Sequence, residues 1–414
     1  MPTPTRLPLR LTCRLTLAVL AVSVTLGVAT GCAITTDDPP VRTVTVGLLH
    51  PSETGADARN GAQLAVDLVN GAQPDLALPL AADRGLPGLD GATLALAVAD
   101  TRGEPAAAEA ALGDLLDAGA VAVVAADRAD VVEIAAAYAN RREVPIVDGA
   151  TSAGYLLDIG LEWYFRTGPA DRTLVDGLLA HLGAATGSGA PAPATVLTPA
   201  GGRGADVAAL VADQAATAGL VLTDPVTVGT SVAAELTTRA PRVLVAVAPE
   251  PADAPALLAE IEGWLAASTP PAADAAPPLL AGAGPGFAGV LEDAPAGLRY
   301  ASAYSSELAA RQPLAKAVAA RYQEQFGQPM SESAARSFTA TLTLAMAIDA
   351  AGDTAAGTIR AALRQLSIPA TRIIMPWTGI RFGEDGQNEL AAAVVVRTGV
   401  DGPEVVHPPE LAIP

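Results

Sequence analysis

The feature that most constrains this chain is a regular alternation of short apolar segments with amphipathic helical segments. Residues 44–49 are rich in β-branched side chains, which is typical of a buried strand. The next segment, 57–70, repeats apolar residues at i, i+3, i+4 and i+7 from Ala62, which gives a helix one apolar face. Such alternation favours parallel sheets covered by helices on both sides, so we expect an α/β fold with doubly wound sheets.

The same alternation continues through most of the chain. We expect further strands at 93–99, 121–125, 144–147, 194–197, 242–247 and 279–282, and helices at 104–118, 129–141, 171–182, 206–218 and 254–267. Later helices are expected at 313–326, 331–351 and 355–366. The segment 377–397 is expected to form two strands around a turn at Asp385–Gly386. A length of 414 residues is enough for two or three lobes, each with its own core.

Residues 1–31 carry the parts of an export signal in the usual order. Arg6, Arg10 and Arg14 form a basic region, and the apolar run that follows has the length of a signal-peptide core. Small residues then precede Cys32, which resembles the lipobox of bacterial lipoproteins, where the cysteine is lipidated and becomes the new N-terminus. We therefore predict a lipoprotein signal peptide and lipid attachment at Cys32. Ordinary signal cleavage beside an incidental cysteine is the alternative.

Residues 32–42 are expected to form an extended tether, because their Thr, Asp and paired Pro residues cannot pack. Loss of the signal removes three arginines and no acids, which leaves 22 basic against 44 acidic residues, a formal charge of −22. Such a surface repels nucleic acid and anionic headgroups, so we expect no nucleic-acid partner and membrane attachment through the lipid. Cys13 would leave with the signal, so no disulfide or cysteine metal site is expected.

Four segments stand out along the mature chain: 60–67 (NGAQLAVD), 144–152 (VPIVDGATS), 164–171 (YFRTGPAD) and 377–386 (WTGIRFGEDG). In this order they resemble segments of the type I periplasmic binding proteins of the branched-chain amino acid (Leu/Ile/Val-binding) group. Residues 60–67 resemble the first helix of that family, and 144–152 resemble a strand with its loop. Residues 164–171 resemble a crossover between lobes, and 377–386 resemble a closing segment. These segments are spread across nearly the whole mature chain.

The resemblance implies two lobes joined by three crossovers, with a small-molecule ligand in the cleft between them. It places lobe 1 at 43–167 plus 305–372 and lobe 2 at 168–304 plus 373–414. Closure around the ligand would be read by the permease subunits of an ABC importer. We accordingly expect a monomer without cofactor or metal, anchored by its lipid on the extracytoplasmic face of the cell membrane.

The family holds an α-carboxylate with hydroxyl residues and backbone N–H groups of lobe 1, and Ala150 and Thr151 match those positions. Thr151 is accordingly expected to contact the ligand, with a turn or helix-capping threonine as the alternative. The serine-rich loop of the family is replaced by charged residues. Arg128 is either an anion-binding group or a surface charge, and Asp130 is either part of the site or a cap of the next helix.

In lobe 2 the expected ligand-binding positions also differ from the family pattern. An aromatic position falls near Arg203, and an aromatic pair falls near Glu250. The acid that would hold a substrate ammonium falls near Ala283, which has no carboxylate, and Glu250 is a candidate replacement from another loop. These changes leave amino acids, amides and carboxylates open as ligands.

We expect no enzyme activity. The G-x-G-x-x-G match at 284–289 contains a proline in its turn and precedes no convincing helix, which disfavours dinucleotide binding. His50, His181 and His407 are far apart in the sequence, with His181 expected on a helix surface and His407 in a loose tail. Two other functions remain open: a ligand-sensing receptor lipoprotein of the same fold, and a surface lipoprotein whose pocket has degenerated into a structural role.

Overall fold

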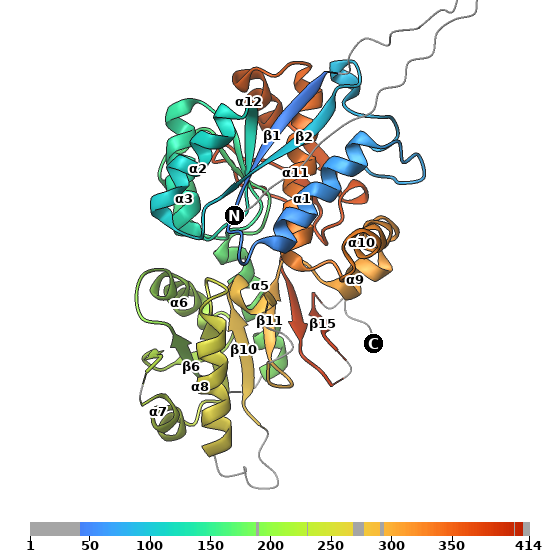
Figure 1. The fold of residues 1–414 in the computed structure, drawn as a ribbon. Helices are drawn as coiled ribbons and strands as arrows, with labels where there is room; N and C mark the ends of the chain where they lie inside the picture. The colour runs from blue at the N-terminus through green and yellow to red at the C-terminus, as the bar shows by residue number, and fades with distance from the viewer. Residues whose placement is uncertain are drawn as a thin grey trace, which may run out of the picture. The chain divides into compact units, whose positions relative to one another are not determined.

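The computed structural model describes residues 42–187, 190–229, 231–267, 277–289, 294–400 and 402–408, all of which lie in one compact unit. The predicted signal peptide, Cys32 and nearly all of the predicted tether lie outside these ranges. The described part contains two large sheets with helices on both sides of each, and one two-stranded sheet, which confirms the α/β fold class (Figure 1). No helix in these ranges combines the length and the apolar character needed to cross a bilayer.

Lobe 1 is built on a five-stranded parallel sheet of order β2-β1-β3-β4-β5. Its strands are β1 Thr43–His50, β2 Thr93–Asp100, β3 Ala120–Ala125, β4 Ile146–Asp148 and β5 Tyr164–Arg166. Its helices are α1 Ala56–Asn70, α2 Pro105–Asp117, α3 Ala129–Arg142, α4 Tyr155–Asp158, α9 Ser306–Arg311, α10 Pro313–Phe326, α11 Glu332–Ala351 and α12 Ala356–Gln365. The strand order reverses beside β1, and ligands of such sheets bind beyond the carboxyl ends of the strands at this reversal.

Both faces of the lobe 1 sheet are buried, which explains the near-continuous apolar runs in its strands. In β1, Leu48 packs into the core formed with α1, α10 and α11, and Leu49 packs into the core formed with α2 and α3. The approach of α1 to α11 depends on Gly61, because a Cβ there would lie 2.1 Å from the carbonyl oxygen of Ala334. The helix that carries the first family-like segment is thus held by apolar packing in the lobe 1 core and by a close glycine contact with α11.

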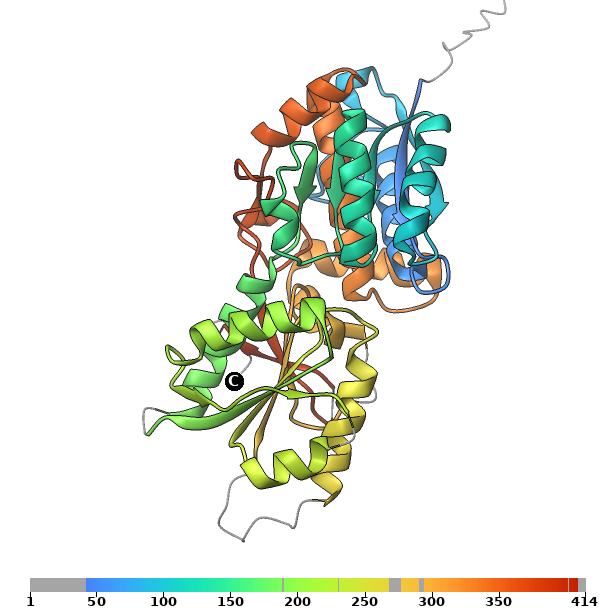
Figure 2. The same cartoon turned by 90° about the vertical axis from the view of Figure 1, so that its left-hand side faces the viewer.

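Lobe 2 is built on an eight-stranded sheet of order β15-β14-β11-β10-β9-β6-β7, with β8 paired to β6. Its strands are β6 Ala192–Thr198, β7 Leu220–Leu222, β8 Val226–Thr227, β9 Val243–Val247, β10 Leu279–Ala283, β11 Arg299–Ser302, β14 Val394–Arg397 and β15 Glu404–His407. Its helices are α5 Asp171–Thr186, α6 Gly202–Ala215, α7 Val232–Arg239 and α8 Ala254–Ala267. Helices α5 and α6 cover one face and α7 and α8 the other, as the turned view shows (Figure 2).

The C-terminal segment differs from our expectation. The turn at Asp385–Gly386 is present, and the residues beside it form a short antiparallel pairing, with Phe382 opposite Asn388 and the N–H of Glu389 donating to the carbonyl of Arg381. Strands β13 and β14, however, do not pair with each other. Instead β13 (Gly379–Arg381) pairs with β12 (Ser367–Pro369), and β14 pairs with β11 and β15. Both strands pair with segments from other parts of the chain, and a local turn pattern carries no information on such pairings. The expected turn is therefore confirmed together with a short antiparallel pairing beside it, but the expectation that the two longer strands pair across it is wrong.

Three segments connect the lobes: the β5–α5 link, the β11–α9 link and the residues just before β14. Residues 373–382 contribute Ile374, Trp377 and Phe382 to the core of lobe 1, although we expected this stretch in lobe 2. This packing favours a third crossover between Phe382 and Val394.

The first and third crossovers are held together by the fully buried Arg166. Its Nε donates to Gln387 at 2.8 Å, and its Nη1 donates to the carbonyl of Ala153 at 2.6 Å. Asn388 donates its backbone N–H to the carbonyl of Arg166 and its side-chain amide to the carbonyl of Thr167. Two distant parts of the chain therefore form one hydrogen-bonded unit between the lobes.

Candidate functional site

The loop after β4 is organised around the buried carboxylate of Asp148. Its Oδ1 accepts the backbone N–H groups of Ala150 at 2.7 Å and Thr151 at 2.9 Å. Its Oδ2 accepts the hydroxyl of Thr151 and, at 2.6 Å, the hydroxyl of Tyr164. Burial first, and then the charge of Asp148, raises the pKa of Tyr164 well above its ordinary value, so this phenol stays a neutral donor.

This arrangement bears on Ala150 and Thr151, the two lobe 1 positions that match the family pattern. Thr151 is 4% exposed, and its hydroxyl proton is already donated to Asp148. Its carbonyl accepts from Nη2 of Arg336 in α11 at 2.9 Å. The local contacts are those of a turn threonine, the alternative that the sequence leaves open beside a ligand contact.

The strongest charged cluster lies at Arg203, in the first turn of α6. Its Nη2 lies 3.0 Å from both carboxylate oxygens of Asp171, and its Nη1 lies 3.5 Å from Glu250. The Arg203 side chain is 15% exposed, so both ion pairs are largely removed from solvent. Because two carboxylates neutralise the guanidinium of Arg203 and occupy its N–H donors, its attraction for an anionic ligand is reduced.

The cluster continues into lobe 1 through Ser152. The hydroxyl of Ser152 donates to Asp171 at 2.5 Å, and the backbone N–H of Asp171 donates to the carbonyl of Ser152 at 2.7 Å. We call Ser152, Asp171, Arg203 and Glu250 the cleft network. Its members come from the β4 loop, the start of α5, the start of α6 and the loop after β9.

Burial raises the pKa of both acids in the cleft network. For Asp171, the charge of Arg203 and the hydroxyl of Ser152 oppose the effect of burial. For Glu250, burial raises the pKa to about 7, against the charge of Arg203 and the backbone N–H of Ala129 at the start of α3. Glu250 therefore faces lobe 1 and changes its charge near neutral pH.

This shift gives a pH prediction for Glu250. Because its folded pKa lies above its ordinary value of 4.5, folding takes up a proton, and stability falls as pH rises from about 4.5 through about 7. Glu250→Gln should remove up to roughly 3 kcal/mol of this pH-dependent loss. Urea unfolding at pH 5 and pH 8 measures it, with the exposed α8 variant Glu262→Gln as control. An unchanged pH dependence in Glu250→Gln would contradict the assignment.

Arg128 and Asp130 pair with each other at 2.7 Å, and both side chains are nearly half exposed. Helix α3 begins at Ala129 with Arg128 at its N-cap position, so Asp130 is not the N-cap residue, but its carboxylate accepts the first-turn N–H of Val131 at 3.0 Å. The neighbouring Asp127 accepts the hydroxyl of Thr101 and the N–H of Arg128. These contacts favour a surface ion pair for Arg128, although its charge lies close enough to lower the pKa of Glu250.

Ala283, where the family acid would fall, is fully buried at the end of β10. The glycine-rich loop after it has a packing role. A Cβ on Gly286 would lie 2.3 Å from the carbonyl oxygen of Glu250, and a Cβ on Gly284 would lie 2.4 Å from that of Ala248. These glycines thus allow the loop after β10 to pack closely against the loop that carries Glu250. This packing is a sufficient reason for glycines at 284 and 286, so the G-x-G-x-x-G match does not require a bound nucleotide.

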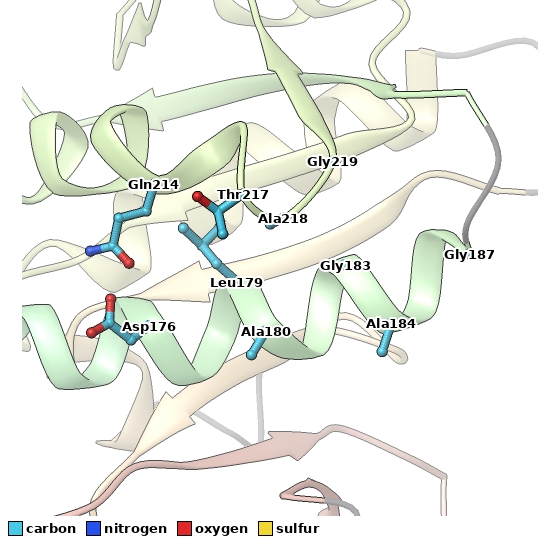
Figure 3. A pocket seen from close by; sticks show the side chains of 10 residues that line it. All are labelled: Asp176, Leu179, Ala180, Gly183, Ala184, Gly187, Gln214, Thr217, Ala218 and Gly219. Atoms are coloured by element: carbon cyan, nitrogen blue, oxygen red, sulfur yellow. The ribbon is translucent and has the colours of Figure 1, made fainter.

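Two surface hollows lie outside the cleft network. One of about 380 Å³ is lined by His50, Ser52, Arg59 and Asp100, and burial is the main cause of the lowered pKa of His50. The other, of about 480 Å³, lies between α5 and α6 and is lined by Asp176, Leu179, Gln214, Thr217 and several Gly and Ala residues (Figure 3). Neither is lined by a network residue. Within the described ranges, no group of three or more His, Cys, Asp or Glu side chains could hold a metal ion.

The sequence identified Arg203 and Glu250, which the structure brings together. It missed Asp171 and Ser152 as site residues. Both stand within family-like segments, and Asp171 is the first residue of an expected helix, which was an available signal. Their pairing with each other and with Arg203 depends on how α5 and α6 pack, and no local pattern shows this.

A family model described as periplasmic binding protein matches residues 43–399. No curated protein sequence matches the chain. An ABC transporter substrate-binding protein from Desulfitobacterium hafniense, in complex with Leu, is 18% identical with a TM-score of 0.71, over 88% of this chain and all of that one. LivJ from Streptococcus pneumoniae, in complex with isoleucine, is 18% identical with a TM-score of 0.67, over 88% and 99% of the two chains.

A solute-binding protein from R. palustris, in complex with benzoate, is 17% identical with a TM-score of 0.67, over 88% of this chain and 95% of that one. At these identities the structural similarity establishes the fold. The family model covers far more than half of the sequence, and its range includes all four segments that resemble the Leu/Ile/Val-binding group. The chain therefore belongs to the periplasmic binding protein family.

Proposed function

We propose that this protein is the lipid-anchored, extracytoplasmic solute receptor of an ABC importer. The observation that carries the proposal is the cleft network, in which polar groups from loops of both lobes meet beyond the ends of parallel strands. Binding at such a position couples occupancy to lobe closure, which permease subunits can recognise. Substrate binding followed by release to a permease needs no catalytic group.

The ligand that we propose is a small polar molecule that carries a carboxylate or an amide. Leucine, isoleucine and benzoate, the ligands of the three similar structures, all carry a carboxylate. Arg203 is already paired with two acids, so a bare anion would compete with Asp171 and Glu250 for it. A ligand that also carries an ammonium could pair with Glu250 as it enters, which favours amino acids within this class.

A thermal-shift screen of the purified mature domain tests the proposed function. The panel contains amino acids, amides, aromatic and aliphatic carboxylates, and sugars. A true ligand should raise the melting temperature progressively once its free concentration exceeds its dissociation constant. No shift with any member of the panel would instead support a degenerate pocket with a structural role.

Thr151 provides a residue-level prediction for the best ligand from that screen. The Thr151 hydroxyl donates its proton to Asp148 but can still accept a hydrogen bond from the ligand. If it does, Thr151→Ala should weaken binding by about threefold to tenfold, because a hydrogen bond contributes about 0.5–1.5 kcal/mol. Thr151→Ser keeps the hydroxyl and should bind nearly as well as the wild type. Isothermal titration calorimetry measures both. Unchanged affinity in Thr151→Ala would remove the Thr151 hydroxyl from the binding site.

The lipid anchor is tested at Cys32, outside the described residues. We expect the wild-type chain to appear in the membrane fraction and to incorporate labelled fatty acid. Cys32→Ala should lose the label and should no longer be anchored, while Cys13→Ala, within the predicted signal, should behave like the wild type. Fatty-acid incorporation by Cys32→Ala would refute attachment at this cysteine.

A further inference from the structure

A second group of charged residues lies on lobe 2, apart from the cleft network. It comprises His181 on α5, Arg299 on β11, Arg397 on β14 and His407 on β15, which we call the basic cluster. The imidazole rings of His181 and His407 lie 6.3 Å apart in an edge arrangement. The two histidines that are distant in the sequence, and that we expected on a helix surface and in a tail, are thus neighbours in the fold.

Strand register explains why these residues meet. Arg299 and Arg397 are direct cross-strand partners, and His407 pairs with Val395. Ala301 and Val395 lie two residues from the two arginines and pack in the core beneath α5. Because side chains alternate along a strand, both arginines stand on the sheet face that α5 covers. Arg299 begins β11, so the cluster lies at the amino end of that strand, whereas ligand loops follow carboxyl ends.

Among the described residues, the two arginines of this group have one acidic partner between them. Arg397 pairs with Glu404 at 2.5 Å. Arg299 forms no ion pair within the described ranges, and its Nη1 donates only to the carbonyl of Gly297 at 2.8 Å. This leaves two guanidinium groups against one carboxylate, on a chain whose formal charge is −19. Such an excess of positive charge is unexpected on so acidic a protein.

Two donors in the cluster are also without partners. In the part of the chain that the structure describes, Nε of Arg299 and Nε2 of His181 are buried and have no hydrogen-bond partner. Unpaired buried donors cost free energy of about 1–3 kcal/mol each. Burial, and then the charges of Arg299, His407 and Arg397, lower the pKa of His181 to about 4. An anion placed among these groups would satisfy the donors and relieve the repulsion.

We propose that the basic cluster binds a small oxyanion of the phosphate type, at a site separate from the ligand cleft. Arginine presents planar pairs of N–H donors that match the oxygens of phosphate, and a protonated imidazole adds a further charged donor. The ion is a soluble one, since the strongly negative chain is repelled by anionic membrane surfaces. Nothing in this proposal depends on the solute that the cleft takes.

Binding of the phosphate monoanion should strengthen as the pH falls toward the pKa of His181, because an anion favours the protonated form of this imidazole. The groups that face His181 are Arg299, Arg397 and His407, with Glu404 attached to Arg397. Of these, Arg299, Arg397 and His407 disfavour the imidazolium in the free protein. A bound phosphate would reverse this balance and raise the pKa of His181 by a unit or more.

The experiment is a phosphate titration of the purified full chain, followed by NMR of its three histidines. Sodium phosphate should shift the His181 and His407 signals saturably, while sodium chloride at equal ionic strength should not. His50, in lobe 1, is the internal reference. Non-saturating shifts, or equal shifts of all three histidines, would show a general salt effect and overturn the proposal.

Arg299→Met supplies the matching variant, since it removes the charge but keeps much of the apolar side-chain stem. We expect its phosphate affinity to fall at least tenfold. Arg172→Met is the control, because Arg172 lies on α5 and pairs with Asp213 at an exposed position. Full phosphate affinity in Arg299→Met would refute the site. If Arg299→Met does not fold, the NMR titration of the wild-type chain with phosphate and with chloride still tests whether the basic cluster binds phosphate.

Discussion

Arg203→Met is expected to lower the free energy of unfolding by about 3 kcal/mol at pH 8, the loss that follows when one partner of a buried ion pair is removed. Arg203 holds Asp171 at 3.0 Å and Glu250 at 3.5 Å, and all three side chains are largely buried. Without the guanidinium, two carboxylates would remain close together in a low-dielectric region. The pKa of each acid should therefore rise further, so the loss of stability should be smaller at pH 5.

Urea unfolding at pH 8 and pH 5 measures this effect. The control is Arg172→Met, whose ion pair with Asp213 is more than half exposed and should contribute less than about 0.5 kcal/mol. If Arg203→Met loses no more stability than Arg172→Met, the two acids do not depend on Arg203. Equal losses at pH 5 and pH 8 would show that their ionisation is not the cause.

Gly61→Ala is expected to destabilise the protein by about 2 kcal/mol, although alanine is the better helix former. The added Cβ would lie 2.1 Å from the carbonyl oxygen of Ala334, so α1 must move away from α11. That movement would loosen the contact between two helices that both contribute buried side chains to the core of lobe 1. The steric cost therefore outweighs the gain in helix propensity of roughly 1 kcal/mol.

Gly263→Ala provides a control of opposite sign. Gly263 is exposed inside α8, and a Cβ there meets nothing within 4 Å. This variant should gain about 0.5–1 kcal/mol from helix propensity alone. Thermal and urea unfolding of both variants measure the contrast. A stabilised Gly61→Ala would mean that α1 and α11 are not in close contact at this point.

The helices and central strands were predictable because their signal is local. Helix α1 repeats apolar residues on one face, and β1 is a run of β-branched and apolar residues. Strand β11 gave no such signal, since Arg299–Ser302 is only four residues long and begins with a charged residue. The pairings of β13 and β14 were also beyond a local pattern, because each strand pairs with segments from other parts of the chain.

Some residues of the candidate site were likewise predictable from the sequence, and others depend on tertiary packing. Arg203 and Glu250 could be found by position within a family pattern, because the loops after strands keep their place. Asp171 could not be assigned to Arg203 from the sequence, since 32 residues separate them and their contact arises from the packing of α5 against α6. The meeting of His181 with His407 likewise requires the antiparallel pairing of β14 and β15 at the far end of the chain.

The hydrogen bonds of Arg166 with Gln387 and of Asn388 with Thr167 have a mechanical consequence. They join two of the three connecting segments into one hydrogen-bonded unit. The link between β11 and α9 is then the second, separate connection between the lobes. Two such connections define one axis about which the lobes can rotate. We therefore expect the lobes to move by a hinge rotation about this one axis. Sliding or twisting of one lobe against the other should be disfavoured, because it would strain the hydrogen bonds of Arg166 and Asn388.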